Sequence, residues 1–226
     1  MPHLVVLSVF TGPDGDYGNE LGIVTDGKVV PDKERQAVAA RLGFSETVFI
    51  DDLEKAELRL YTPAAELPYA GHPLVGVGWW LAAHRGRAVV ILRPPVGDVP
   101  TSMGATGMCW IEGQPEWCPP WQHVRLRSPA AVATATGPPP GHDAVQVWAF
   151  IDEQIGLVRA RVFAPRFGVR EDEACGSASQ LLSARLGRPL TINHGNGSEI
   201  FVQPGRAGTI ELGGRVRWRS ERTLHL

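Results

Sequence analysis

The 226-residue sequence predicts an α+β fold of two similar lobes, each with a mixed or mostly antiparallel sheet around one apolar helix. A repeated segment is the main evidence. Residues 59–63 and 161–165 each have the pattern of a strand that ends near a proline, and an acidic stretch follows both. An apolar helix then opens at Gly71 in the first copy and at Gly176 in the second. The composition fits a globular fold, because 43% of the residues are hydrophobic and 20% are charged.

The first half shows the periodicities of strands and of two helices. Asp32 can cap a helix that ends at Gly43. Leu74, Val77 and Leu81 recur at helical spacing. We therefore expect helices at residues 32–43 and 72–84, and strands at residues 3–10, 21–25, 47–50, 58–61, 88–92 and 107–111.

Residues 112–121 contain three prolines and two tryptophans, which is typical of a stiff connector. The predicted domains are therefore residues 1–112 and 113–226, with the boundary placed to within about ten residues. In the second half we expect a helix at residues 177–186, a loop at 138–140, a turn at 213–214, and strands at 144–151, 156–163, 190–193, 200–203, 209–212 and 215–218.

Charge and cysteine content narrow the class of protein. A net charge of −2 and a pI near 6.4 argue against nucleic acid or a membrane surface as a partner. The sequence has no signal-peptide pattern at its start and no apolar run near the ~20 residues of a membrane span. Three cysteines without Cys-x-x-Cys spacing suit a reducing compartment, so we expect a cytoplasmic protein. The seven scattered histidines do not predict a metal site.

The two helix starts point to a ligand. The first turn of a helix presents unpaired N–H groups and the positive end of the helix dipole. If both starts face one site, they would hold a small carboxylate-bearing substrate from two sides.

Three ionisable residues are candidates for a chemical role, but each could instead have only a structural role. Glu46 stands before an apolar strand, where partial loss of hydration would suit a general base, or else it is a solvent-facing residue at a strand edge. His72 could cap its helix, and Asp172 could simply favour the helix dipole. Spacing does not rank Asp172 above the other nearby acidic residues, which are Glu66, Glu171 and Glu173.

At this point the chain resembles a known family. The motifs that carry the resemblance are Ser45-Glu46-Thr47-Val48-Phe49, Tyr61-Thr62-Pro63, Glu66-Leu67-Pro68-Tyr69-Ala70-Gly71-His72-Pro73 and Gly168-Val169-Arg170-Glu171-Asp172-Glu173-Ala174-Cys175-Gly176-Ser177-Ala178, together with Val9-Phe10-Thr11 and Gly18-Asn19. They are similar to motifs of the phenazine-biosynthesis PhzF-like family. The resemblance implies a diaminopimelate-epimerase-like fold, in which two pseudo-symmetric lobes each wrap a curved sheet around a central helix and the active site lies between them.

The resemblance also implies roles for individual residues. Glu46 would be the general base, and His72 and Asp172 would assist proton transfer. Gly71, Gly176 and Ser177 match positions that bind the substrate, and Ser45 and Cys175 are further substrate-binding candidates. It implies no cofactor and no metal, and it implies a homodimer.

The chain departs from the family pattern at Cys175, where the usual residue is threonine. Cys175 could be a second proton carrier opposite Glu46, because a helix start favours the reactive thiolate. The alternative is that Cys175 stands in for threonine as a small packing residue. The matching position of the first lobe is Ala70, so a racemase with two thiols is excluded.

The predicted function is therefore a cofactor-independent isomerase or epimerase that moves a proton on a small carboxylate-bearing substrate. The family's named reaction is the isomerisation of a dihydro-hydroxyanthranilate. The alternative is a small-molecule binding or regulatory protein on the same scaffold that has no turnover.

Overall fold

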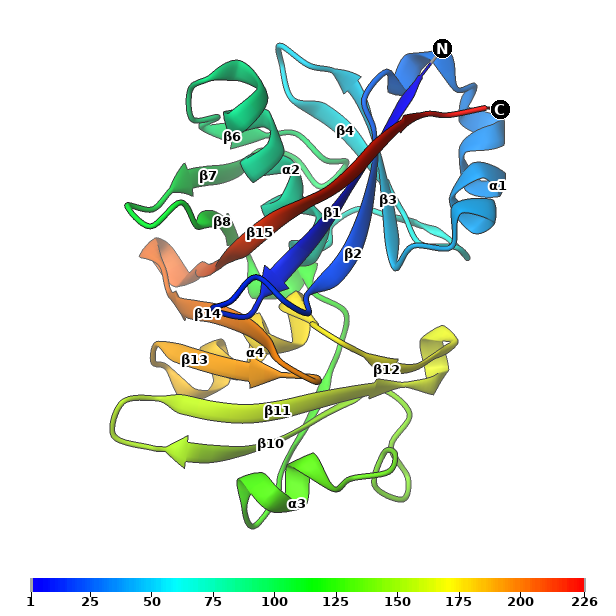
Figure 1. Ribbon diagram of the computed structural model, residues 1–226. Coiled ribbons are helices and arrows are strands. Elements are labelled where there is room, and N and C mark those ends of the chain that lie inside the picture. Colours follow the sequence, from blue (N-terminus) through cyan, green and yellow to red (C-terminus); the bar gives the residue numbers. More distant parts are fainter. Residues whose placement is uncertain (1, 226) are drawn as a thin grey trace.

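One continuous sheet runs through both halves of the chain in the computed structural model, which describes residues 2–225 (Figure 1). Its main path has the order β5-β4-β3-β2-β1-β15-β14-β13-β11-β10-β9. The strands of the first half are β1 (His3–Thr11), β2 (Asn19–Val24), β3 (Glu46–Asp52), β4 (Glu57–Tyr61), β5 (Glu66–Leu67), β6 (Ile91–Leu92), β7 (Val99–Met103) and β8 (Cys109–Gly113). Those of the second half are β9 (Gln122–Arg125), β10 (Val145–Asp152), β11 (Leu157–Ala164), β12 (Val169–Asp172), β13 (Leu190–His194), β14 (Ser198–Pro204) and β15 (Ile210–Thr223).

In each half, one largely buried helix packs against this sheet. The α-helices are α1 (Asp32–Leu42), α2 (Gly71–Arg85), α3 (Pro129–Ala133) and α4 (Gly176–Leu186), and the 3-10 helices are η1 (Gly27–Val29), η2 (Pro115–Trp117), η3 (Pro165–Phe167) and η4 (Arg206–Gly208). Helix α2 is apolar on nearly all sides and contacts β1, β2, β8 and β15. A helix of this kind is stable only when it is enclosed. Helix α4 packs in the same way on β14 and β15. The arrangement confirms the predicted α+β class.

The internal repeat is also visible in the hairpins that precede α2 and α4. In the β3–β4 hairpin, Asp52 Oδ1 accepts hydrogen bonds of 3.0 Å from the backbone N–H groups of Glu54 and Lys55. Asp152 does the same in the β10–β11 hairpin, at 2.9 and 3.4 Å. Each turn then needs a left-handed residue, Ala56 (φ 55°) in one copy and Gly156 (φ 72°) in the other. The two lobes therefore share local geometry as well as sequence.

After each hairpin the chain forms a short strand that leads to the helix. Strand β5 pairs antiparallel with β4, and β12 pairs antiparallel with β11. An arginine on the longer strand holds a glutamate on the short one through two nitrogen–oxygen contacts. These pairs are Arg59–Glu66 and Arg161–Glu171. Each pair fixes the short strand that precedes the helix start.

The last strand, β15, joins the two halves. Residues 215–223 pair with β1, whereas residues 210–214 pair with β8 and residues 210–213 with β14 (Figure 1). The predicted turn at Gly213-Gly214 is therefore wrong, because the strand continues through it. An ideal Cβ atom at Gly213 would lie 2.3 Å from the ring of Trp110, and one at Gly214 would lie 2.3 Å from the ring of Phe10. These glycines are needed for the close approach of two aromatic rings, not for a turn.

Other predictions about elements are corrected in detail. The strand expected at 88–92 shortens to β6, and the one expected at 107–111 is displaced to β8. The sequence did not predict β5, β7, β9, β12 or α3. The domain boundary near residue 113 stays a prediction. Within the described residues, none of the helices is both long and apolar enough to cross a membrane.

Candidate active site

Glu46 and His72 form a hydrogen-bonded pair at the start of α2. Glu46 is the first residue of β3, and its Oε2 lies 2.8 Å from His72 Nδ1. His72 Nε2 lies 3.1 Å from the backbone oxygen of Asn19. A carbonyl oxygen only accepts hydrogen bonds, so Nε2 carries a hydrogen. The contact between Glu46 and His72 then holds one further proton, which either residue can carry.

The surroundings of this pair favour the charged form of His72. The side chain of His72 is 5% exposed and that of Glu46 is 18% exposed. Burial by itself lowers the pKa of His72, but the negative charge of Glu46 and its hydrogen bond, followed by the charge of Asp172, outweigh burial and raise that pKa. A protonated His72 leaves Glu46 as a carboxylate, which is the form that a general base requires.

Asn19 connects this pair to the second half of the chain. Its side-chain nitrogen donates to Asp172 Oδ1 at 2.8 Å, and its side-chain oxygen accepts from Ser45 Oγ at 2.6 Å. Its backbone oxygen accepts from His72. Asn19 is not among the site residues predicted from the sequence. The only sequence signal for Asn19 is its place in the Gly18-Asn19 motif, because the residues to which it hydrogen-bonds are far away along the chain.

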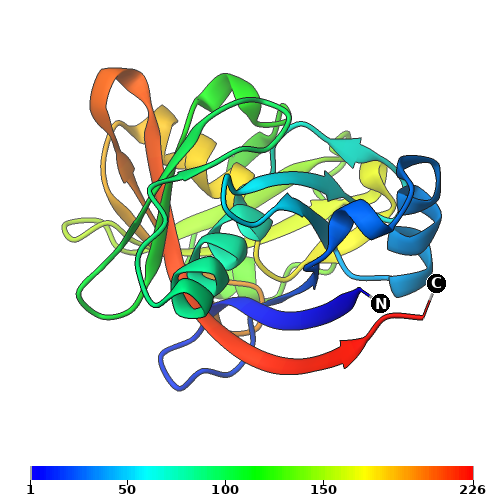
Figure 2. The same ribbon diagram turned by 90° about the horizontal axis from the view of Figure 1, so that it is seen from above.

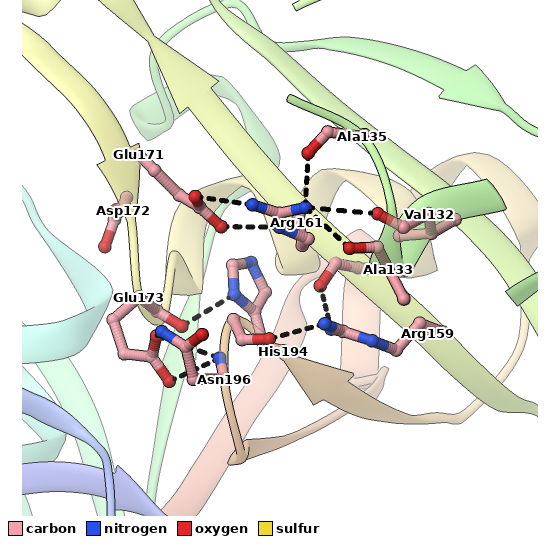
Figure 3. A network of polar contacts seen from close by, with 12 residues as sticks. Val132, Ala133, Ala135, Arg159, Arg161, Glu171, Asp172, Glu173, His194 and Asn196 are labelled. Carbon is pink, nitrogen blue, oxygen red and sulfur yellow. Dashed lines mark hydrogen bonds and ion pairs between the residues drawn. The ribbon is translucent and has the colours of Figure 1, made fainter. Parts of the chain in front are cut away.

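Asp172 is the acidic residue of its segment that faces this site. Alternation along β12 turns the preceding residue, Glu171, the other way. Glu171 pairs with Arg161, and Glu173 accepts from Asn196, as Figure 3 shows. Asp172 also accepts from the N–H of Ala174 at 3.2 Å. Glu66, the other candidate, is held by Arg59.

The pKa of Asp172 is raised from 3.8 to about 6. Burial is the main cause, and the negative charge of Glu46 adds to it, while His72 and the N–H of Ala174 act in the opposite direction. A carboxyl group whose pKa is close to neutrality can both give and take a proton under physiological conditions.

The two helix starts lie against each other. An ideal Cβ atom at Gly176 would be 3.2 Å from the backbone nitrogen of His72 and 2.9 Å from Leu212. One at Gly71 would be 2.4 Å from the same leucine. Neither Ala70 nor Cys175, the residues that precede the helices, accepts a capping bond through its side chain. The N–H groups of both first turns are therefore not capped by those side chains and can serve a ligand.

Cys175 and Ser177 lie together at the start of α4. Their Sγ and Oγ atoms are 3.7 Å apart, and Trp121 Nε1 donates to Ser177 Oγ at 2.9 Å. Burial and then the charge of Asp172 raise the pKa of the Cys175 thiol well above its usual value. A helix start by itself favours the thiolate, but loss of hydration acts against it here, and the role of Cys175 stays a prediction.

Phe10 forms an apolar wall beside His72. Its ring centroid is 6.1 Å from that of the imidazole, and the residue is fully buried. Its backbone adopts a φ of 66°, a left-handed conformation that costs a non-glycine residue about 1–3 kcal/mol. Strained residues of this kind are often found at functional sites.

The structure thus connects the eight predicted site residues through the contacts described above; their roles in a reaction stay predictions. Two cavities, of about 530 and 360 Å³, lie elsewhere in the molecule. Within residues 2–225, no three His, Cys, Asp or Glu side chains are grouped so as to hold a metal ion.

Comparison with known proteins adds an independent finding. The family model described as phenazine biosynthesis-like protein matches residues 7–113 and 141–224. Among curated proteins, the chain is 26% identical to the trans-2,3-dihydro-3-hydroxyanthranilate isomerase of Pseudomonas chlororaphis and 27% identical to that of Pseudomonas aeruginosa. Each match covers 91% of this chain and 88% of the relative.

Solved structures show the same fold at lower identity. A putative phenazine biosynthesis PhzC/PhzF protein from Clostridium difficile has a TM-score of 0.80 at 16% identity, with both chains fully covered. A predicted epimerase from Pseudomonas aeruginosa has a TM-score of 0.79 at 21% identity, over 99% of each chain. A probable proline racemase from Agrobacterium radiobacter has a TM-score of 0.66 at 12% identity, covering all of this chain and 93% of that one.

Proposed function

The chain belongs to the phenazine biosynthesis-like protein family, and we propose that it is an isomerase that moves a proton, without a cofactor, on a small carboxylate-bearing substrate. The observation that supports this proposal most directly is the hydrogen-bonded series from Glu46 through His72 and Asn19 to Asp172. It brings two proton-carrying carboxyl groups from different halves of the chain to two adjacent helix starts.

In the proposed reaction Glu46 is the general base. Its Oε2 is engaged by His72, so Oε1 is the oxygen that would accept a proton from a carbon atom of the substrate. The electron pair left on that carbon delocalises into the adjacent carboxylate or conjugated system. The N–H groups at the starts of α2 and α4 would stabilise the negative charge that develops there.

A proton then returns to the same carbon or to a nearby one, so that the atoms of substrate and product balance. Return from Glu46 to a nearby carbon gives an isomer with a moved double bond. Return from Asp172 to the opposite face of the same carbon gives an epimer. The pKa of about 6 suits Asp172 to either transfer near neutral pH.

The reaction for which the relatives are named provides the first substrate to test, trans-2,3-dihydro-3-hydroxyanthranilate. We propose that it, or another small cyclic acid with an acidic C–H next to a carboxylate or conjugated system, is turned over. A homodimer and a cytoplasmic location stay predictions.

The test is proton exchange in D₂O for a panel of such acids, followed by NMR. We expect Glu46→Gln to slow exchange by ~10² or more, because the amide cannot take a proton. Binding of benzoate, an unreactive carboxylate, should change little. Glu57→Gln is the matched control, since its side chain is 43% exposed on the neighbouring strand.

Two results would contradict the proposal. Exchange at a normal rate in Glu46→Gln would show that the base lies elsewhere. Tight binding of carboxylates without exchange in the unmodified protein would instead support the alternative, a binding or regulatory protein on this scaffold.

A further inference from the structure

The larger of the two cavities lies toward the opposite end of α2 from His72. Its volume is about 530 Å³, which is in the range of small-molecule sites. Trp79, Trp80 and His84 line it from the last turns of α2, and Trp218 lines it from β15. At a rise of 1.5 Å per residue, Trp79 and His84 lie about 10 and 18 Å from His72 along the helix axis.

Three tryptophans and two histidines are among the ten residues that line the cavity. Trp80 is buried and stacks on His84, with ring centroids 4.9 Å apart and an angle of 17° between the planes. Trp218 is 43% exposed, although tryptophan is usually well buried. Three of the chain's seven tryptophans therefore surround one opening.

The charged groups of the same cavity are acidic. Glu221 lies 3.3 Å from His3, and both side chains are about half exposed. They stand on β15 and β1, which run side by side as red and blue ribbons in Figure 2. Asp26 is the second acidic residue of the lining, and its side chain is not used to cap the following helix η1. Among the residues that the structure describes, no Lys or Arg lines the cavity, and Arg85 in the last turn of α2 is not part of the lining.

These observations indicate the chemistry of a ligand. Aromatic faces attract cations by about 0.5–2 kcal/mol, most strongly for tryptophan. Two carboxylates and the negative end of α2 add to this attraction. We propose that the cavity is a second binding site, for an organic cation that carries an aromatic or bulky apolar group. This site is independent of the proton-transfer function.

The experiment uses the indole N–H signals of the seven tryptophans in a ¹H–¹⁵N NMR spectrum. The probe is benzyltrimethylammonium, and benzyl alcohol and benzoate are its neutral and anionic counterparts. We expect the cation to shift the signals of Trp79, Trp80 and Trp218 and to bind at least ~10-fold more tightly than benzyl alcohol. The signal of Trp121, which bonds to Ser177 in the active site, should not move with the cation.

Variants test the residues. Trp218→Ala should weaken binding of the cation by ~10-fold, whereas Trp218→Phe should keep most of it, because phenylalanine still offers an aromatic face. The double variant Asp26→Asn, Glu221→Gln should weaken binding of the cation without changing that of benzyl alcohol. Ile155→Ala, at an exposed hairpin tip, is the control and should bind normally.

Three outcomes would overturn the proposal. The first is equal binding of all three probes, and the second is a shift of Trp121 by the cation in place of the cavity signals. The third is a change of the Trp218 signal with protein concentration while the cation has no effect, which would show that a second copy of the chain covers the cavity. Failure of proton exchange would leave these readouts unaffected, so the two proposals are tested separately.

Discussion

Replacing Asp172 by asparagine should stabilise the protein at neutral pH while it impairs function. The folded protein raises the pKa of Asp172 from 3.8 to about 6, so its ionised form is disfavoured by about 3 kcal/mol on folding. Asparagine carries no charge and can still accept from Asn19 and from the N–H of Ala174. We therefore expect Asp172→Asn to have the larger free energy of unfolding at pH 7.

The size of this gain should depend on pH with a definite sign. The folded-state pKa lies above the unfolded-state pKa, so the stability that Asp172 contributes is fully present below about pH 4 and is lost as the pH rises through about 6. At pH 5 the free-energy cost of ionising Asp172 in the folded protein is about half of its value at pH 7. The advantage of the variant should thus be larger at pH 7 than at pH 5 by about 1 kcal/mol.

Urea unfolding of both proteins at pH 5 and pH 7 measures this difference directly. Comparing the change with pH in the two proteins removes any constant effect of altered hydrogen bonds. It also cancels most of the contribution of His72, whose pKa is raised too and whose stabilisation is likewise lost toward high pH. A variant that is less stable at both pH values by the same amount would refute the reasoning, because Asp172 would then carry no penalty for its charge.

Three further predictions concern neighbouring residues. Asn19→Ala should raise the pKa of Asp172 further, as seen in ¹³C NMR titration of its carboxyl carbon, because the N–H bond that favours the ionised form is lost; no movement would mean that Asn19 does not act on Asp172. Cys175→Thr should leave turnover unchanged, and iodoacetamide should label Cys175 slowly at neutral pH, since its thiol is buried and protonated; rapid labelling that substrate blocks would instead indicate a proton carrier. Gly213→Ala should lower the free energy of unfolding by about 1–3 kcal/mol in a denaturant titration, because its Cβ atom would collide with the Trp110 ring; an unchanged midpoint would show that the ring moves freely.

The parts of the fold that follow from local pattern could be predicted. Helix α2 could be predicted from the helical spacing of Leu74, Val77 and Leu81, and most of the strands from their apolar runs. By contrast, Gly213-Gly214 has the local pattern of a turn, yet Phe10 and Trp110 pack onto it from distant parts of the chain. Strand β12 is short and polar and is a strand only because β11 pairs with it.

The site, too, has features that local sequence predicts and features that depend on tertiary packing. Glu46, His72 and Asp172 lie beside motifs that could be identified from the sequence, so their proximity could be predicted. Asn19 could not be assigned, because its side chain bonds to Asp172, and that contact depends on how the two halves pack. The protonation state of Cys175 could not be predicted for a similar reason, since the burial that raises the pKa of its thiol is a tertiary property.

The pairing of β1 with β15 has a consequence for synthesis on the ribosome. His3 is opposite Thr223, so β1 acquires this neighbour only after the 220 residues that follow His3 have been translated. At roughly 5–20 residues per second, β1 waits on the order of ten seconds or more. Eight of its nine residues are buried in the finished protein. During translation its apolar edge is an open template for other strands, and a chaperone that covers such edges would protect the nascent chain.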